Sequence, residues 1–161
     1  MDNTENDIIK SLDFLVIKSR ELLQEQLNSY ESSNSKAGVL ISISSLLIPI
    51  ALSFISNANT LLCIKILTII PTAAMILALS FLLKVLMPKG LDHGFNFEQF
   101  DRLVNNSHQD LLLYEIGANK DSYNANSSVV KMQNRNFKTG IILIFSSSII
   151  LFILITISLF L

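Results

Sequence analysis

Residues 139–161 read TGIILIFSSSIILFILITISLFL and contain no charged side chain. An α-helix rises about 1.5 Å per residue, so about 20 apolar residues cross the roughly 30 Å hydrocarbon layer of a bilayer. Two further stretches are also uncharged and nearly as long, residues 37–55 (AGVLISISSLLIPIALSFI) and residues 66–83 (ILTIIPTAAMILALSFLL). The sequence therefore predicts three membrane-spanning helices.

The charged residues of the chain are few and unevenly placed. They make up 16% of the sequence, whereas a soluble domain carries about 25%. All of them except Lys65 lie in residues 1–36 and 84–138. Three uncharged stretches leave too little of the 161 residues for a sizeable water-soluble core. This excludes an ordinary soluble enzyme.

The sequence carries no recognisable catalytic motif. The patterns HExxH, GxSxG, GxGxxG and Walker A are absent from it. The single cysteine, Cys63, excludes an intramolecular disulfide and a cysteine-based zinc site, and His93 and His108 stand apart. We expect no enzyme activity, no catalytic residue, no metal site and no cofactor.

The lysine and arginine residues predict the orientation of the spans. Of these 12 residues, all but Lys65 lie in residues 1–36 and 84–138. Positive residues favour the cytoplasmic side, so we expect a bacterial inner (plasma) membrane protein with a cytoplasmic N-terminus and an outer C-terminus. The predicted order is a cytoplasmic amphipathic helix (1–36), a transmembrane hairpin (37–87), a cytoplasmic helical connector (88–138) and a third transmembrane helix (139–161).

The predicted fold is an all-α integral membrane protein with a cytoplasmic helical stalk. Residues 7–36 lack Gly and Pro and place apolar residues in steps of three and four, which predicts a helix that can continue into the first span. After Pro88, the apolar residues from Phe95 to Val104 suggest a short amphipathic helix, and Ser107 suggests a helix N-cap. Residues 110–161 are expected to form one long helix, or two that break near Gly117. One chain has too few stalk helices to bury both apolar stripes, so we expect a homo-oligomer.

Cations and tyrosines in the stalk are candidates for an anionic ligand. A nucleotide base stacks on tyrosine while arginine or lysine meets its phosphate. The alternative is a solvated or packed surface. The candidate ligand-binding residues are Lys10, Lys18, Arg20, Arg102, Tyr114, Lys120 and Tyr123.

A second cationic cluster precedes the third span. Lys131, Arg135 and Lys138 follow one another in steps of four and three, so they share one helix face. One interpretation is an anchor at the lipid headgroups. The other is a positively charged pore mouth or a site for an anionic ligand.

The arrangement of these parts resembles a known class of protein. An amphipathic helix with Tyr30 and Asn34 leads to Lys36-Ala37 at the first span, and Lys131 belongs to the basic end of a helix that enters the terminal span. This layout resembles the transmembrane effectors of nucleotide-controlled bacterial anti-phage systems, in particular the Pycsar transmembrane effector domain. The channel effector of Hailong systems, which oligodeoxyadenylate holds shut, is similar in plan.

The resemblance implies a homo-oligomeric ion channel or pore in antiviral defence. A partner nucleotidyltransferase or cyclase makes a nucleotide second messenger or a short single-stranded oligonucleotide, which opens or closes the pore. Opening depolarises the membrane and arrests growth, the outcome called abortive infection. Two alternatives remain: a holin-like or toxin-like pore that needs no ligand, and a non-conducting membrane scaffold that recruits a cytoplasmic partner.

Overall fold

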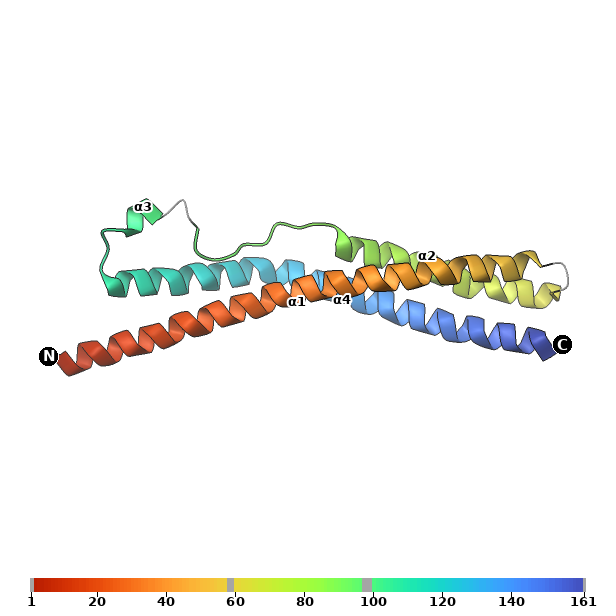
Figure 1. Ribbon diagram of the computed structural model, residues 1–161, viewed down its shortest axis with the longest axis horizontal. Helices are drawn as coiled ribbons and strands as arrows, with labels where there is room; N and C mark the ends of the chain where they lie inside the picture. Colours follow the sequence, from red (N-terminus) through yellow and green to blue (C-terminus); the bar gives the residue numbers. More distant parts are fainter. Residues whose placement is uncertain (1, 58–59, 97–99, 161) are drawn as a thin grey trace. The chain divides into compact units, whose positions relative to one another are not determined.

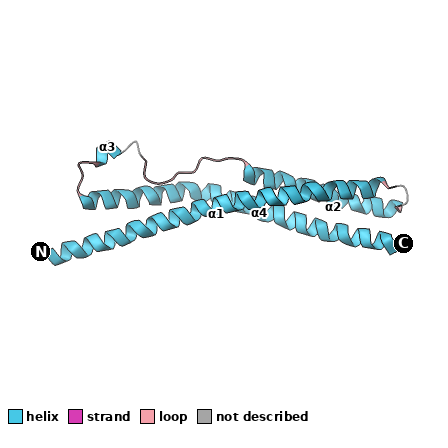
Figure 2. Ribbon diagram, in the orientation of Figure 1, coloured by secondary structure: helices cyan, strands magenta, loops and turns pink. Residues whose placement is uncertain are grey.

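The structure is a computed structural model that describes residues 2–57, 60–96 and 100–160. The described residues form four helices and no strand (Figures 1 and 2). The helices are α1 (Asp2–Ser56), α2 (Leu62–Leu86), α3 (Phe100–Leu103) and α4 (His108–Phe160). The prediction of an all-α protein is confirmed.

Three of these helices match the predicted spans. Within the described residues, α1, α2 and α4 are each long and apolar enough to cross a membrane. Pro49 lies inside α1 and Pro71 inside α2 without ending either helix. Such prolines are tolerated in membrane helices because neighbouring groups satisfy the freed backbone. The protein is therefore an all-α membrane protein with three transmembrane helices.

The helix ends correct one prediction and sharpen two others. The helix expected from Phe95 onward is only α3, because Phe95 lies in a loop and Phe97 lies outside the described residues. Gly117 does not break α4. Ser107 caps that helix as predicted, because the backbone N–H of Asp110 donates to Ser107 Oγ at 3.2 Å.

The chain divides into two compact units. The first, called the stalk unit here, comprises Met1–Glu31 and Lys89–Lys131. The second, called the membrane unit, comprises Ser32–Pro88 and Met132–Leu161. Helices α1 and α4 each contribute residues to both units without an interruption.

The long helices bury side chains at steps of seven residues. This spacing is typical of helices that wrap around one another. In α1 one such series of buried positions is Val16, Leu23, Tyr30, Ala37, Ser44 and Ala51. In α4 one such series is Leu112, Asn119, Asn126, Gln133, Gly140 and Ser147.

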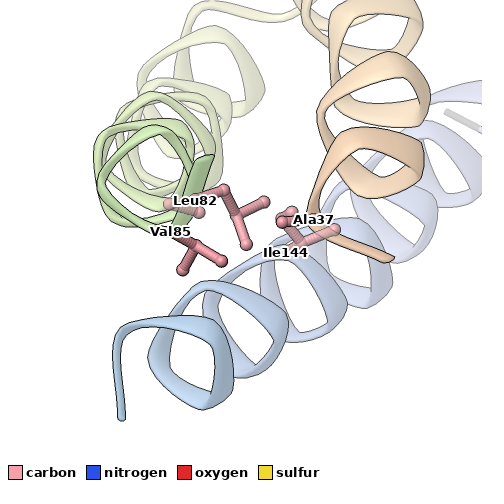
Figure 3. Close-up of a cluster of buried hydrophobic side chains, with 5 residues drawn as sticks. Ala37, Leu82, Val85 and Ile144 are labelled. Carbon is pink, nitrogen blue, oxygen red and sulfur yellow. The ribbon is translucent and has the colours of Figure 1, made fainter. Parts of the chain in front are cut away.

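The core of the membrane unit is built from all three spanning helices. Ala37 of α1, Leu82 and Val85 of α2, and Ile144 of α4 converge in one buried cluster (Figure 3). Gly140 belongs to the same contact, because a Cβ atom at this position would lie 2.7 Å from Leu82 Cδ2. The absence of a side chain at position 140 therefore sets how closely α2 and α4 pack.

Three buried hydroxyl groups of the spans are satisfied within their own helices. Thr68 and Thr72 are buried, and each donates at 2.8 Å to the carbonyl four residues earlier. Ser44 is fully buried and donates in the same way to the carbonyl of Leu40 at 2.8 Å. Since a hydroxyl without a partner is costly in hydrocarbon, these bonds explain how the spans tolerate so many Ser and Thr residues.

Polar side chains make specific contacts in the stalk unit, beside buried apolar residues such as Val16, Leu23 and Leu112. Asn119 of α4 donates to Ser19 Oγ of α1 at 3.0 Å. Asn126 forms two hydrogen bonds with the backbone of Asp92, at 2.9 Å to its N–H and 2.8 Å to its carbonyl. Ser122 accepts the N–H of Gly94 at 3.2 Å. The loop after α2 thus lies along α4 as a strap, defined here as residues 89–96.

Candidate ligand site in the stalk unit

Two of the predicted ligand-binding cations are already paired. Arg20 forms a two-pronged ion pair with Glu115, with its Nη2 at 2.7 Å from Oε2 and its Nε bonded to Oε1. These bonds raise the pKa of Arg20. Lys18 Nζ lies 2.5 Å from Glu21 Oε2, and the pKa of Lys18 is raised by this bond. Neither charge is fully available for a phosphate.

Arg20 also lines two hollows of the stalk unit. One, of about 480 Å³, is shared with His93 and Asn119, and the other, of about 550 Å³, with Phe95 and Glu115. An anion in either hollow has to compete with the carboxylate of Glu115 for the guanidinium. This competition makes both hollows weaker candidates for a phosphate site.

Tyr114 packs inside the unit. Its ring stands edge-on to Phe95, with the centroids 6.0 Å apart and the planes at 90°. This is a favourable geometry for an aromatic pair. Tyr114 therefore holds the strap residue Phe95, and its ring is partly committed to that contact.

Tyr123 and Lys131 are brought together. They line one cavity of about 280 Å³ between the α1 and α4 segments of the stalk unit. The other lining residues are Leu22, Glu25, Gln26, Ser29, Ser127 and Val130. Tyr123 keeps 40% of its surface exposed. Lys131 is exposed and forms no ion pair with any described residue. An aromatic residue, a cation without an ion pair among the described residues and the carboxylate of Glu25 thus border the same cavity.

Gln26 is the residue of this cavity that sequence reasoning missed. It is 9% exposed, and its Nε2 donates to the backbone carbonyl of Tyr123 at 3.1 Å. Its buried Oε1 accepts no hydrogen bond from the described residues. Position 26 lies seven residues from Ser19 and Ser33, both of which face α4. That seven-residue step is the signal in the sequence that marks Gln26 as buried.

The remaining candidates are dispersed. Lys10, Arg102 and Lys120 are exposed, and none of them forms a hydrogen bond or ion pair with a described residue. Arg135 and Lys138 are also exposed. They share a face with Lys131 because α4 is unbroken there, but they belong to the membrane unit.

The described residues offer no metal site. No group of three or more His, Cys, Asp or Glu side chains among them is placed to hold a metal ion. Cys63 is free and exposed at the start of α2. The side chains that gather in the stalk unit offer a ligand hydrogen bonds, aromatic contact and charge.

Comparison with known proteins identifies the family. No curated protein and no solved structure matches the chain. A family model described as the Pycsar effector protein domain matches residues 18–160, which cover nearly the whole chain. The chain therefore belongs to the Pycsar effector family and is a transmembrane effector of anti-phage defence.

Proposed function

We propose that this effector is a homo-oligomeric membrane channel whose opening is set by a nucleotide bound to its stalk unit. The observation that carries the proposal is the continuity of two helices. Helices α1 and α4 border the cavity of Tyr123 and Lys131 and run on, unbroken, into two of the membrane spans. A ligand that favours one separation of these helices in the stalk shifts the equilibrium between two packings of the spans.

The cavity suits a mononucleotide. Its volume of about 280 Å³ is near the lower end for small-molecule sites, roughly 300–1,000 Å³. The exposed ring of Tyr123 offers a face for base stacking, and Lys131 offers a charge for the phosphate. Glu25, which also lines the cavity, is an acceptor for a ribose hydroxyl. This donor and acceptor set favours a single nucleotide over an oligonucleotide chain.

Exposed apolar side chains of the stalk unit support self-association. Phe14, Ile17, Leu22, Val104 and Leu113 each expose about half of their surface or more. They lie outside the uncharged spans, on the side that the lysine and arginine bias assigns to the cytoplasm. Because water disfavours such a surface, a second copy of the chain covering these residues is the proposed assembly.

Leakage from liposomes tests the channel. The purified chain is reconstituted in dye-loaded and ion-loaded vesicles and challenged with a panel of cyclic mononucleotides and with short oligodeoxyadenylate. We expect leakage that changes with one nucleotide class. Leakage that ignores every ligand favours the ligand-independent pore. A protein that is monomeric in detergent and never conducts contradicts the channel, and a soluble partner captured by that non-conducting protein favours the scaffold.

The cavity is tested by point variants of its wall. Tyr123→Ala and Lys131→Gln are expected to weaken nucleotide binding by about fivefold to 150-fold each, since stacking and a phosphate contact each contribute about 1–3 kcal/mol. Lys120→Gln is the matched control, because Lys120 is an exposed lysine of the same helix that does not line the cavity. If all three variants bind the nucleotide with equal affinity, the ligand binds somewhere other than this cavity.

A further inference from the structure

Four cations of the membrane unit lie at one level of its three-helix core. Lys36 precedes Ala37, and Lys84 lies between Leu82 and Val85 of the buried cluster. Lys138 follows Phe137, which packs on that cluster. Arg135 lies about one helical turn before Lys138. We call Lys36, Lys84, Arg135 and Lys138 the cationic collar.

Contacts between the helices confirm that these cations share a level. The site of Gly140 touches Leu82, so α4 at position 140 lies beside α2 at position 82. Gln133 Nε2 donates to Asn34 Oδ1 at 2.7 Å, so α4 at position 133 lies beside α1 at position 34. Every collar residue is within three positions of one of these contacts or of the cluster.

No carboxylate of the membrane unit balances the collar. Residues 32–88 and 132–161 contain no Asp or Glu, and the only other cation in them is Lys65, near the start of α2. All four collar side chains are exposed. Lys84 Nζ lies over the Phe81 ring, 5.6 Å from its centroid, which is a cation–π distance.

We propose that the cationic collar is a binding surface for the headgroups of anionic phospholipids. Uncharged helix begins directly beyond the collar on all three spans, which places the four charges at the depth of the lipid phosphates. The four cations are exposed and come from three different helices. Long lysine and arginine side chains attract anionic headgroups, and each charge near the surface adds to the affinity.

The test compares lipids and two matched triple variants. Full-length protein in mild detergent is titrated with phosphatidylglycerol or phosphatidylcholine, and bound lipid is counted by native mass spectrometry alongside the midpoint of thermal unfolding. We expect retention of phosphatidylglycerol only, and at least about tenfold weaker retention in Lys84→Gln/Arg135→Gln/Lys138→Gln. The control is Lys10→Gln/Arg102→Gln/Lys120→Gln, which removes the same charges from the stalk unit and keeps wild-type retention.

Additional measurements distinguish binding of the whole lipid from binding of its phosphate headgroup alone. They also distinguish a loss of binding from misfolding. Inorganic phosphate and glycerol 3-phosphate are expected to raise the unfolding midpoint of the wild type by much less than phosphatidylglycerol does. Lys84→Arg/Lys138→Arg keeps the charge and is expected to retain the lipid. On wild-type protein, high salt is expected to weaken retention. Equal retention of the two lipids, unchanged retention in the collar variant, or an equal effect of inorganic phosphate overturns the proposal.

Discussion

Gly140 of α4 occupies a position where no side chain fits. A Cβ atom there would lie 2.7 Å from Cδ2 and 2.8 Å from Cγ of Leu82, which is fully buried. We expect Gly140→Ala to destabilise the membrane unit by about 1–3 kcal/mol, the usual cost of overpacking a core. Thermal unfolding in detergent, followed by circular dichroism, measures the loss. Gly38→Ala is the control, because a Cβ atom at position 38 would meet no neighbouring atom within 4 Å.

The clash also predicts a rescue at position 82. Leu82→Ala alone leaves a cavity, but combined with Gly140→Ala it gives the new methyl group room. The double variant is therefore expected to lose less stability than the sum of the two single variants. Strictly additive losses contradict the direct contact between these residues.

Gly117 illustrates the opposite case within the same helix. It lies inside unbroken α4, and a Cβ atom there would meet no neighbouring atom within 4 Å. Gly117→Ala is therefore expected to stabilise the protein by about 0.5–1 kcal/mol, because alanine loses less backbone freedom on folding. Hydrogen exchange of the neighbouring amides is expected to slow. Faster exchange after the substitution indicates a bend at this position.

At the scale of elements, the strap is held by side chains of α4. Asn126 is 2% exposed and bonds both backbone groups of Asp92. Asn126→Leu removes both bonds, which contribute about 0.5–1.5 kcal/mol each. We therefore expect the amide of Asp92 to exchange about fivefold faster or more. The control is Asn124→Leu on the exposed side of the same helix. Equal exchange in the two variants contradicts the role assigned to Asn126.

The elements differ in how well the sequence predicts them. The three spans were predicted because charge is excluded from hydrocarbon, and the continuity of α1 was predicted because residues 7–36 contain neither Gly nor Pro. The prediction that a helix starts at Phe95 is wrong, because this residue belongs to the strap. The strap backbone is fixed by Asn126 and Ser122, which lie 34 and 28 residues away from their partners. The local periodicity of the sequence cannot predict hydrogen bonds between residues that lie so far apart in the chain.

Only part of the candidate site could be predicted from the sequence, because its cavity also depends on contacts between distant residues. Tyr123 and Lys131 were singled out by chemical type, since aromatic and cationic side chains are what a nucleotide needs. Their common cavity depends on how α1 packs on α4, which no window of one helix reveals. Gln26 was missed because glutamine in an amphipathic helix usually faces water. Only the seven-residue spacing from Ser19 to Gln26 to Ser33 distinguishes it.

At the scale of the whole molecule, the low charge is the average of two different units. The membrane unit contains no acidic residue, whereas the stalk unit contains all 13 acidic residues of the chain. In the stalk unit, polar side chains make several of the contacts between helices. Hydrogen bonds of this kind exchange for water at little net cost. A polar interface can therefore be rearranged by a ligand more readily than the tightly packed contact of Gly140 and Leu82.

If α1 and α4 carry the signal, breaking either helix at the unit boundary uncouples the pore from its ligand. Ser32→Pro removes a backbone N–H inside α1 and disrupts the helix, at a free-energy cost of about 3 kcal/mol. Met132→Pro does the same in α4. We expect each variant to bind nucleotide with an affinity within about threefold of that of the wild type. Its leakage rate is expected no longer to depend on the nucleotide, because a bent helix transmits little displacement.

Ser32→Ala and Met132→Ala keep the helices and are expected to respond normally. Vesicle leakage and equilibrium binding, measured on the same preparations, separate the two properties. Nucleotide-dependent leakage that survives in both proline variants means that the signal travels by another route, and the strap after α2 is then the element to cut.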